Sequence, residues 1–428
     1  MGLIIRGGGR LSGDIRVPGD KSISHRGVIL GALANGTTVI ENILMAEDTR
    51  RTIKCFQDMG VEMEMDGDSL RIEGVGLHGL HESKDELYCG NSGTTMRLLS
   101  GVMVGQKFST ILTGDDSLDK RPMDRIIIPL TMMGGSIKGV DNRYPPLHIE
   151  PSKGGLEAIS YSLPMASAQV KSSILLAGLY GNGITRIEEP KVTRDHTEMM
   201  LKYFGVDIYS EDGFICMEPN GLLSGGHIHV PGDISSAAYL MVAGSMIKDS
   251  HIIIRDVGVN PTRTGIINIL KDMGADIRIN NRRIANLEPI ADIEVKYSSL
   301  KGIEMGGEMV ATMIDEIPIL AVAAAFASGR TVIRDVEELR YKECDRIRAI
   351  HDGLSNMGAD IEELPDGLII EGGATLKPAA LDSHGDHRIA MALSIAALGA
   401  EGESRINGHR AVDISYPDFY KTLWKLSQ

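Results

Sequence analysis

The sequence predicts an α/β protein with two similar domains, each built from three β-α-β-α-β-β units whose first helices are buried. Two repeated patterns lead to this prediction. In the first, a short polar cluster stands directly in front of a helix-like run of small apolar residues, and this combination occurs six times. In the second, a helix that ends in a glycine signal passes into an alternating strand, and this combination occurs five times. Self-similarity of this kind indicates a repeat architecture.

The six apolar runs indicate that the first helix of each unit lies in the interior. They span residues 28–34, 95–104, 174–179, 237–243, 317–327 and 389–398. Each run is apolar on nearly every face, which is typical of a buried helix. The polar clusters in front of them are Lys21-Ser22 to Arg26, Asn91-Ser92-Gly93, Ser167 to Lys171, Ser235-Ser236, Asp315-Glu316 and Asp386-His387-Arg388. Because the first turn of a helix has unpaired N–H groups and the positive end of the helix dipole, each cluster is a potential anion site.

The second helix of each unit is predicted from a shared ending. An apolar residue, usually methionine, precedes a glycine at the position where a left-handed cap ends a helix; these glycines are Gly60, Gly134, Gly205, Gly274 and Gly358. An alternating strand such as residues 276–279 follows each one. Strand signals such as residues 37–40 and 330–333 separate the two helices of a unit. The sixth copy, residues 419–426, is cut short by the C-terminus.

Two Val-Pro-Gly-Asp segments, at residues 17–20 and 230–233, mark the expected domain boundaries. Proline presets φ, glycine tolerates a positive φ and aspartate can cap the following helix, so both segments are interpreted as turns. With three units to a domain, we expect residues 17–229 to form an N-terminal lobe. Residues 1–16 and 230–428 then form a C-terminal lobe, and the active site is expected in the cleft between the lobes.

The residues that follow these two turns differ in charge. Lys21 and Arg26 follow the first turn, whereas Ile234 and Tyr239 occupy the matching positions after the second. A fold that works without cations after the second turn does not require them after the first. We therefore interpret Lys21 and Arg26 as functional residues rather than as part of a solvated basic turn.

The overall charge points to small anionic ligands. The chain of 428 residues has a formal net charge of −14, which argues against nucleic acid as a partner, and an aromatic fraction of 4%, which argues against base stacking. Basic residues nevertheless gather in the polar clusters, namely Lys21, Arg26, Arg97, Arg121, Lys171, Arg194, Lys342, Arg346 and Arg388. A locally basic cleft in an acidic protein favours small, highly charged anionic substrates.

Several other kinds of site are not expected. Residues 74–79 match the glycine fingerprint of dinucleotide-binding proteins, but no apolar helix follows, so we interpret them as a loop and expect no cofactor. No spacing typical of a metal site occurs, so we expect no metal. The longest apolar run is too short to cross a bilayer, and no signal-peptide pattern opens the chain, so we expect no membrane partner. Four cysteines without paired spacing are typical of the cytoplasm, where we expect the protein to work.

Two clusters in the first half carry a strong anion-binding signal. Residues 91–97, Asn-Ser-Gly-Thr-Thr-Met-Arg, combine a tight glycine turn with hydroxyl groups at a helix start. Arg121 stands directly before Pro122, so the proline can begin a helix while the guanidinium binds a carboxylate or phosphate through two hydrogen bonds.

A third cluster lies in the second half. Lys342 and Arg346 are four residues apart, so we expect them on one face of a helix. The alternative is a salt-bridged surface helix that also contains Glu343 and Asp345. The presence of residues 386–388, Asp-His-Arg, at another helix start in the same half favours a binding site.

Together these motifs resemble the enolpyruvyl transferases. The resemblance covers nearly the whole chain and rests on five motifs in order: Lys21-Ser22-x3-Arg26, Asn91-Ser-Gly-Thr-x-Met-Arg97, Arg121-Pro122, Lys342-Glu-x-Asp-Arg346 and Asp386-His-Arg388. It implies the inside-out α/β barrel of that family, with two lobes that close on their substrates. Within the family, the chain is most similar to members that transfer the enolpyruvyl group of phosphoenolpyruvate to the 5-hydroxyl of shikimate 3-phosphate and release phosphate.

The resemblance also implies a set of binding residues. Those implied for phosphoenolpyruvate are Lys21, Gly93, Arg121, Gln169, Arg346 and Arg388. Those implied for shikimate 3-phosphate are Lys21, Ser22, Arg26, Ser167, Gln169, Arg194, Asp315 and Lys342. The chain departs from the family pattern at Glu338, where the family has an asparagine, and at Ile414, where it has a lysine.

The expected mechanism is addition followed by elimination. The methylene carbon of phosphoenolpyruvate accepts a proton while the 5-hydroxyl loses one, and the tetrahedral intermediate then expels phosphate. Asp315 is expected to take the hydroxyl proton, because it starts an apolar and therefore dry helix. Lys21 and Glu343 are both candidates for the proton donor to the methylene, with His387 as an orienting partner or alternate.

Two alternatives remain open at this point. The sister enzyme that acts on UDP-N-acetylglucosamine carries a cysteine before its Arg-Pro pair, whereas residues 115–120 contain none. A non-catalytic anion-binding protein would gain nothing from carboxylates such as Asp315 and Glu343. We therefore expect an enzyme acting on shikimate 3-phosphate, and we expect it to be a monomer.

Overall fold

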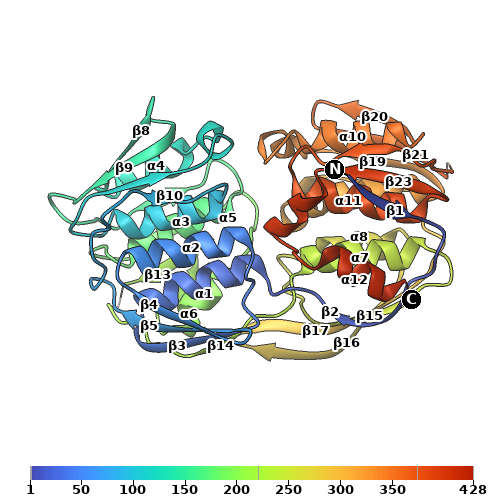
Figure 1. Ribbon diagram of the computed structural model, residues 1–428. Helices are drawn as coiled ribbons and strands as arrows, with labels where there is room; N and C mark the ends of the chain where they lie inside the picture. The colour runs from blue at the N-terminus through green and yellow to red at the C-terminus, as the bar shows by residue number, and fades with distance from the viewer. Residues whose placement is uncertain (1, 220, 374, 428) are drawn as a thin grey trace. The chain divides into compact units, whose positions relative to one another are not determined.

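The computed structural model describes residues 2–219, 221–373 and 375–427, which fold into two compact units. The N-terminal unit contains Gly19–Val230 together with Ala285–Glu288. The C-terminal unit contains Met1–Pro18, Pro231–Ile284 and Pro289–Gln428. Figure 1 labels the helices and strands of each unit.

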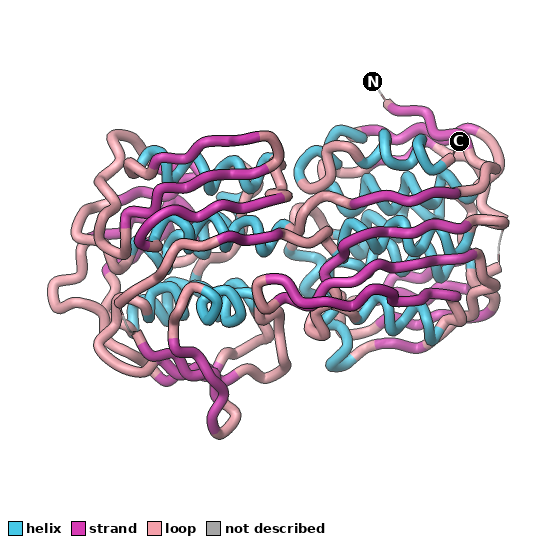
Figure 2. Tube along the Cα trace, turned by 90° about the horizontal axis from the view of Figure 1, so that it is seen from below, coloured by secondary structure: helices cyan, strands magenta, loops and turns pink. Residues whose placement is uncertain are grey.

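Among the residues that the structure describes, the N-terminal unit has three four-stranded sheets with one shared topology. Figure 2 draws the strands in magenta. In each sheet the first two strands are parallel and the remaining neighbours are antiparallel. The sheets are β14 (His227–His229), β3 (Asn35–Glu41), β5 (Ser69–Val75) and β4 (Glu62–Asp66); β6 (Leu87–Tyr88), β7 (Thr110–Thr113), β9 (Tyr144–Glu150) and β8 (Ser136–Val140); and β10 (Ser160–Ser162), β11 (Thr185–Glu188), β13 (Phe214–Glu218) and β12 (Asp207–Glu211).

The C-terminal unit repeats this topology with one shorter sheet. Its four-stranded sheets are β2 (Ser12–Arg16), β15 (His251–Gly258), β17 (Glu288–Lys296) and β16 (Asp276–Ala285), and β18 (Glu304–Met305), β19 (Gly329–Ile333), β21 (Gly367–Gly372) and β20 (Asp360–Leu364). The third sheet is β22 (Ala380–Asp382), β23 (Glu403–Asn407) and β1 (Leu3–Arg6). The described strands thus form separate sheets around helices, and the α/β class and the repeated unit are as predicted.

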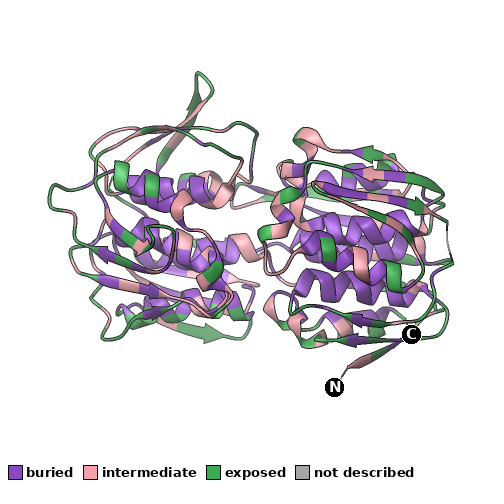
Figure 3. Ribbon diagram, turned by 90° about the horizontal axis from the view of Figure 1, so that it is seen from above, coloured by how far each residue is buried: buried purple, intermediate pink, exposed green. Residues whose placement is uncertain are grey.

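The first helix of each repeat is buried on nearly all sides (Figure 3). These helices are α1 (Lys21–Leu33), α3 (Gly93–Met103), α5 (Ala168–Gly178), α7 (Ile234–Met246), α9 (Ile317–Phe326) and α11 (His387–Gly399). The second helices have one buried and one exposed face; they are α2 (Glu47–Asp58), α4 (Asp124–Met132), α6 (His196–Tyr203), α8 (Gly265–Asp272), α10 (Arg346–Asn356) and α12 (Phe419–Leu426). The apolar runs therefore identified the interior helices correctly.

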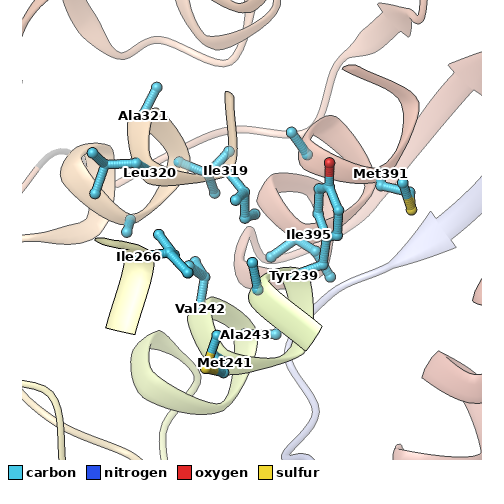
Figure 4. Close-up of a cluster of buried hydrophobic side chains, with 14 of the residues drawn as sticks. Tyr239, Met241, Val242, Ala243, Ile266, Ile319, Leu320, Ala321, Met391 and Ile395 are labelled. Carbon is cyan, nitrogen blue, oxygen red and sulfur yellow. The ribbon is translucent and has the colours of Figure 1, made fainter. Parts of the chain in front are cut away.

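The core of the C-terminal unit shows how these helices pack. Tyr239 and Val242 of α7, Ile319 and Leu320 of α9, and Ile395 of α11 lie in one hydrophobic cluster (Figure 4). All of them are fully buried. Burying one large apolar side chain contributes about 1.5–3 kcal/mol, so the packing of these helices stabilises the unit substantially.

Strand exchange explains the two Val-Pro-Gly-Asp segments. β2 directly precedes α1 in the chain, yet it pairs with β15 of the C-terminal unit. β14 directly precedes α7, yet it pairs with β3 of the N-terminal unit. The chain therefore passes from one unit to the other at each segment. β1 pairs antiparallel with β23 and so completes the sheet of the sixth repeat.

The glycines predicted to end the second helices adopt the expected backbone conformation. Their φ angles are +92° at Gly60, +88° at Gly134, +98° at Gly205, +94° at Gly274 and +88° at Gly358. A side chain is strained in this left-handed region, which is why glycine recurs there. The prediction of five helix ends is confirmed.

Most of the interior helices begin with a side-chain cap. Asp20, Ser92, Ser167, Asp233 and Asp386 each accept a hydrogen bond from a backbone N–H in the first turn of the helix that follows. The helix α9 is different, because it has no such cap bond and follows the 3-10 turn η3 (Ile314–Glu316). Asp315 and Glu316 are therefore not used as caps.

Candidate active site

The start of α1 presents a partly exposed lysine. Lys21 Nζ lies 2.5 Å from Asp48 Oδ2, and the lysine side chain is 18% exposed. Burial, followed by the charges of Lys21 and Arg26, lowers the pKa of His25 well below its usual value. The imidazole is therefore neutral, and its Nδ1 lies 2.7 Å from Thr52 Oγ1.

Arg26 connects three helices of the N-terminal unit. Its Nε donates to Thr197 Oγ1 at 2.6 Å, its Nη2 to Ser172 Oγ at 2.7 Å and its Nη1 to the Ser22 carbonyl at 3.0 Å. Arg194 Nη1 lies 3.5 Å from Ser22 Oγ. Three of the residues implied for shikimate 3-phosphate, Ser22, Arg26 and Arg194, are thus neighbours, and Arg26 also holds α1 against α5 and α6.

A second group surrounds the start of α3. Arg121 Nη2 donates to Asn91 Oδ1 at 2.5 Å, and its Nη1 donates to the Asn91 carbonyl at 3.2 Å. A methyl group added at Gly93 would lie 3.0 Å from Arg97 Nη1 and 3.7 Å from Arg121 Nη1. Both guanidinium groups therefore flank the glycine, and a side chain at this position would crowd Arg97.

Arg97 also belongs to this group, although it is absent from the predicted site residues. Its Nη1 donates to Gln169 Oε1 at 2.5 Å, and Gln169 Nε2 donates to Thr94 Oγ1 at 3.0 Å. Gln169 lies in the first turn of α5, where Ser167 is the cap. The signal for Arg97 was present, since the residue lies in the motif of residues 91–97.

Lys171 does not contribute to a basic site, and its inclusion among the basic cluster residues was wrong. The side chain is 1% exposed, and its Nζ lies 2.6 Å from Glu198 Oε1 and 2.9 Å from Glu189 Oε2. Burial raises the pKa of Glu198, against the opposing effect of the nearby lysine charge. A buried ammonium requires such partners, so its charge is neutralised locally.

In the C-terminal unit, one buried guanidinium gathers three carboxylates. Arg346 is 2% exposed. Its Nε donates to Asp386 Oδ2 at 2.7 Å, its Nη2 to Glu343 Oε2 at 2.6 Å and its Nη1 to Asp315 Oδ1 at 3.2 Å. Although burial alone would lower the pKa of Arg346, these carboxylates raise it well above its usual value. The structure thus brings the predicted residues Asp315, Glu343 and Arg346 together.

Lys342 does not share a helix with Arg346, and that prediction was wrong. Lys342 ends the 3-10 helix η4 (Glu337–Tyr341) in extended backbone, whereas α10 begins at Arg346. The Asp345 carboxylate caps α10 by accepting from the Arg348 N–H at 3.1 Å, so the helix starts there. Lys342 Nζ instead lies 3.1 Å from Glu338 Oε1.

Arg388 occupies the first turn of α11 and is also buried. Its Nη1 lies 3.8 Å from Glu316 Oε1, and its Nε has no hydrogen-bond partner among the residues that the structure describes. Although burial alone would lower the pKa of Arg388, the charges of Tyr239 and of nearby carboxylates raise it. His387 is 2% exposed, with its Nδ1 3.9 Å from Asp386 Oδ1. Arg388 is therefore a charged group with an unused donor at a helix N-terminus.

The charges in this part of the C-terminal unit are not predominantly basic. Two arginines, Arg346 and Arg388, lie among four carboxylates, those of Asp315, Glu316, Glu343 and Asp386. An anionic ligand must therefore compete with carboxylates for Arg346, whereas Arg388 offers an open donor. The carboxylates also supply groups that can accept or donate protons.

The described residues contain neither a metal-binding cluster nor a membrane-spanning helix. Within residues 2–219, 221–373 and 375–427, no group of three His, Cys, Asp or Glu side chains is arranged to hold a metal ion. In the same ranges, every helix is too short or too polar to span a bilayer. Of the loop expected at residues 74–79, Gly74 and Val75 instead end β5, whereas residues 76–79 are a loop that leads to β6 and not into a helix.

Comparison with known proteins gives consistent results. The model of the EPSP synthase (3-phosphoshikimate 1-carboxyvinyltransferase) family matches residues 5–423. The chain is 52% identical over 413 residues to the 3-phosphoshikimate 1-carboxyvinyltransferase of a Thermoanaerobacter species, covering 96% of this chain and 97% of the relative. It is 49% identical over 420 residues to that of Brevibacillus brevis, covering 98% of both chains.

Solved structures agree with these relatives. EPSP synthase from Acinetobacter baumannii superposes with a TM-score of 0.90 at 46% identity, covering 100% of this chain and 98% of that one. The enolpyruvyl transferase NikO from Streptomyces tendae superposes with a TM-score of 0.80 at 19% identity, covering 99% of this chain and 97% of that one, which supports the fold alone. The resemblance and the fold class predicted from the sequence are therefore confirmed.

Proposed function

The chain belongs to the EPSP synthase family, and we propose on that premise how its residues carry out the reaction of a 3-phosphoshikimate 1-carboxyvinyltransferase. The enzyme transfers the enolpyruvyl group of phosphoenolpyruvate to the 5-hydroxyl of shikimate 3-phosphate and releases phosphate. Both substrates are small anionic molecules, in agreement with the expectation from charge. Transfer to UDP-N-acetylglucosamine is not favoured, because the relatives above are named for the shikimate reaction.

Each of the two substrates has its own set of proposed binding residues. We propose that phosphoenolpyruvate is bound by Lys21, Gly93, Arg121, Gln169, Arg346 and Arg388, to which Arg97 is added as a neighbour of Gln169. We propose that shikimate 3-phosphate is bound by Lys21, Ser22, Arg26, Ser167, Gln169, Arg194, Asp315 and Lys342. Lys342 also pairs with Glu338, so the substrate shares the charge of this lysine with a carboxylate.

The observation that best supports anion binding is the state of Arg388. A buried guanidinium is costly when a donor lacks a hydrogen-bond acceptor. Its Nε lacks one among the described residues, while its charge and the α11 dipole both favour an anion at that place. A carboxylate or phosphate oxygen of phosphoenolpyruvate would satisfy the donor.

The carboxylates around Arg346 support the proposed proton transfers. Asp315 takes the proton of the 5-hydroxyl as the new C–O bond forms, and Lys21 or Glu343 protonates the methylene carbon, with His387 as orienting partner or alternate. In the elimination step a proton returns from the methyl group, the double bond re-forms and the C–O bond to phosphate breaks. Preorganised charges near the reacting atoms stabilise the charge that develops in these steps.

The proposed function is tested by measuring phosphate release. The purified protein should release phosphate only when phosphoenolpyruvate and shikimate 3-phosphate are both present. Release with UDP-N-acetylglucosamine in place of shikimate 3-phosphate would instead support the sister reaction, and binding without release would indicate a non-catalytic protein. We further propose that the enzyme works as a monomer in the cytoplasm without a cofactor; sedimentation at working concentration checks the oligomeric state.

A further inference from the structure

A chain of buried polar side chains connects three helix starts in the C-terminal unit. Arg263, in the loop before α8, is 3% exposed, and its Nη2 donates to Ser235 Oγ at 2.7 Å. Ser235, in the first turn of α7, donates its hydroxyl hydrogen to Glu316 Oε1. Glu316 directly precedes α9, and its Oε1 lies 3.8 Å from Arg388 Nη1 in α11. The series of contacts therefore leads to Arg388.

Glu316 attracts the Arg388 guanidinium by its charge but accepts no hydrogen bond from it. The carboxylate is 1% exposed, and its Oε2 has no hydrogen-bond partner among the described side chains and backbone groups. A carboxylate buried this deeply is unfavourable unless positive charge offsets it. Two arginines provide this positive charge. Arg263 donates to the same Ser235 hydroxyl that binds Glu316. Arg388 lies close to Glu316 but beyond the range of a hydrogen bond.

Arg346 shows the contrasting arrangement in the same unit. Its three side-chain nitrogens each donate to a carboxylate, so a ligand has to share this guanidinium with three negative charges. Arg388 is also buried, but its Nε has no hydrogen-bond partner among the described residues. The difference follows from what holds Glu316, because a carboxylate engaged by Ser235 is not free to approach the guanidinium of Arg388.

We propose that Ser235, Glu316 and Arg263 are positioning residues for Arg388. Ser235 and Arg263 hold the Glu316 carboxylate, and its charge fixes the direction of the guanidinium while leaving the donors available for phosphoenolpyruvate. The inference rests on the proposed function, since it takes Arg388 as a ligand of that substrate. It assigns a role to residues outside the binding set proposed above.

The first test is Ser235→Ala. Without the hydroxyl, Glu316 loses its hydrogen bond and pairs directly with Arg388, so phosphoenolpyruvate has to displace it. The KM for phosphoenolpyruvate should rise about tenfold, the size expected when a hydrogen bond to a charged group is lost. The KM for shikimate 3-phosphate should change by less than about twofold, and Ser235→Thr, which restores a hydroxyl, should recover most of the loss.

Ser245→Ala is the matched control. Ser245 lies in the same helix, is fully buried and has a hydroxyl without a hydrogen-bond partner among the described atoms. The change should leave both KM values unaltered. If Ser235→Ala and Ser245→Ala give the same kinetics as the unaltered enzyme, the positioning role is wrong.

Glu316→Gln provides a second test that does not depend on Ser235→Ala folding. The amide oxygen still accepts from Ser235, but the charge that directs Arg388 is gone. Positioning predicts a higher KM for phosphoenolpyruvate, by about threefold or more, whereas simple removal of a repulsive negative charge predicts a lower one. A lower KM would overturn the proposal. Failure of the proposed function would be seen in a different experiment, because the unaltered protein would then release no phosphate even with both substrates present.

Discussion

Substituting Asp315 examines the chemical step directly. The Asp315 side chain is 17% exposed, and its Oδ1 lies 3.2 Å from Arg346 Nη1. In Asp315→Ala, Arg346 keeps its bonds to Asp386 and Glu343, so the buried guanidinium still has two carboxylate partners and the protein should fold. Loss of a general base lowers turnover by about 10² to 10⁴. This corresponds to about 3–5 kcal/mol in the activation free energy.

The assay is phosphate release at saturating concentrations of both substrates, with the KM values measured in parallel. Asp315→Asn is the matched control, because it keeps the shape and an oxygen that accepts from Arg346 but cannot act as a base. Both variants should lose turnover to a similar extent, and the other proposed ligands of shikimate 3-phosphate should keep the rise in its KM small compared with that loss. If Asp315→Asn kept near-native turnover, the assignment of Asp315 as the base would be refuted, and a loss confined to the alanine variant would mean that Asp315 acts through Arg346.

Three further predictions concern stability and can be measured by urea unfolding. In Gly101→Ala, the added methyl would lie 2.2 Å from the Ser173 carbonyl oxygen, so overpacking should lower the free energy of unfolding by about 1–3 kcal/mol. Gly9→Ala is the control, because a methyl group there has no atom within 4 Å. Equal stabilities of the two variants would contradict the close approach of α3 and α5. Lys171→Met leaves two glutamates without their cation and should cost about 3–5 kcal/mol, whereas an unchanged midpoint would mean that the lysine is not a structural counter-ion. Because burial holds the pKa of His25 well below its usual value, the unfolded chain binds more protons than the folded one below about pH 6.5, and stability should fall by up to about 1.4 kcal/mol per pH unit there. His25→Gln should reduce this slope, and identical slopes would show that His25 does not contribute.

The features predicted well from the sequence are those that depend on nearby residues. The φ angle at Gly205 follows from the helix end that it terminates, and the burial of α9 follows from its lack of any polar face. The turn at residues 17–20 likewise follows from local chemistry, with Asp20 capping α1. Repetition strengthened each of these signals, because the same local solution recurs along the chain.

The predictions that failed depended on a partner that spacing does not reveal. A spacing of four positions from Lys342 to Arg346 is compatible with one helix, but Asp345 caps α10, so the helix begins only at Arg346. Lys171 belongs to a polar cluster like the others, yet the carboxylates that neutralise it lie 18 and 27 positions further along the chain, at Glu189 and Glu198. Whether a cation binds a ligand or a carboxylate is decided by such tertiary contacts.

The start of α9 shows how one repeated scaffold can free side chains for another role. Where a serine caps an interior helix, its single side-chain oxygen is occupied by a backbone N–H, as for Ser167 at α5. At α9, Pro318 lies in the first turn and has no N–H to satisfy, so less capping is needed there. Asp315 and Glu316 can therefore face Arg346 and Arg388 instead of the helix. The helix start that lacks a side-chain cap is thus the one that supplies carboxylates to both arginines, and that difference between the repeats could be identified only by comparing their contacts.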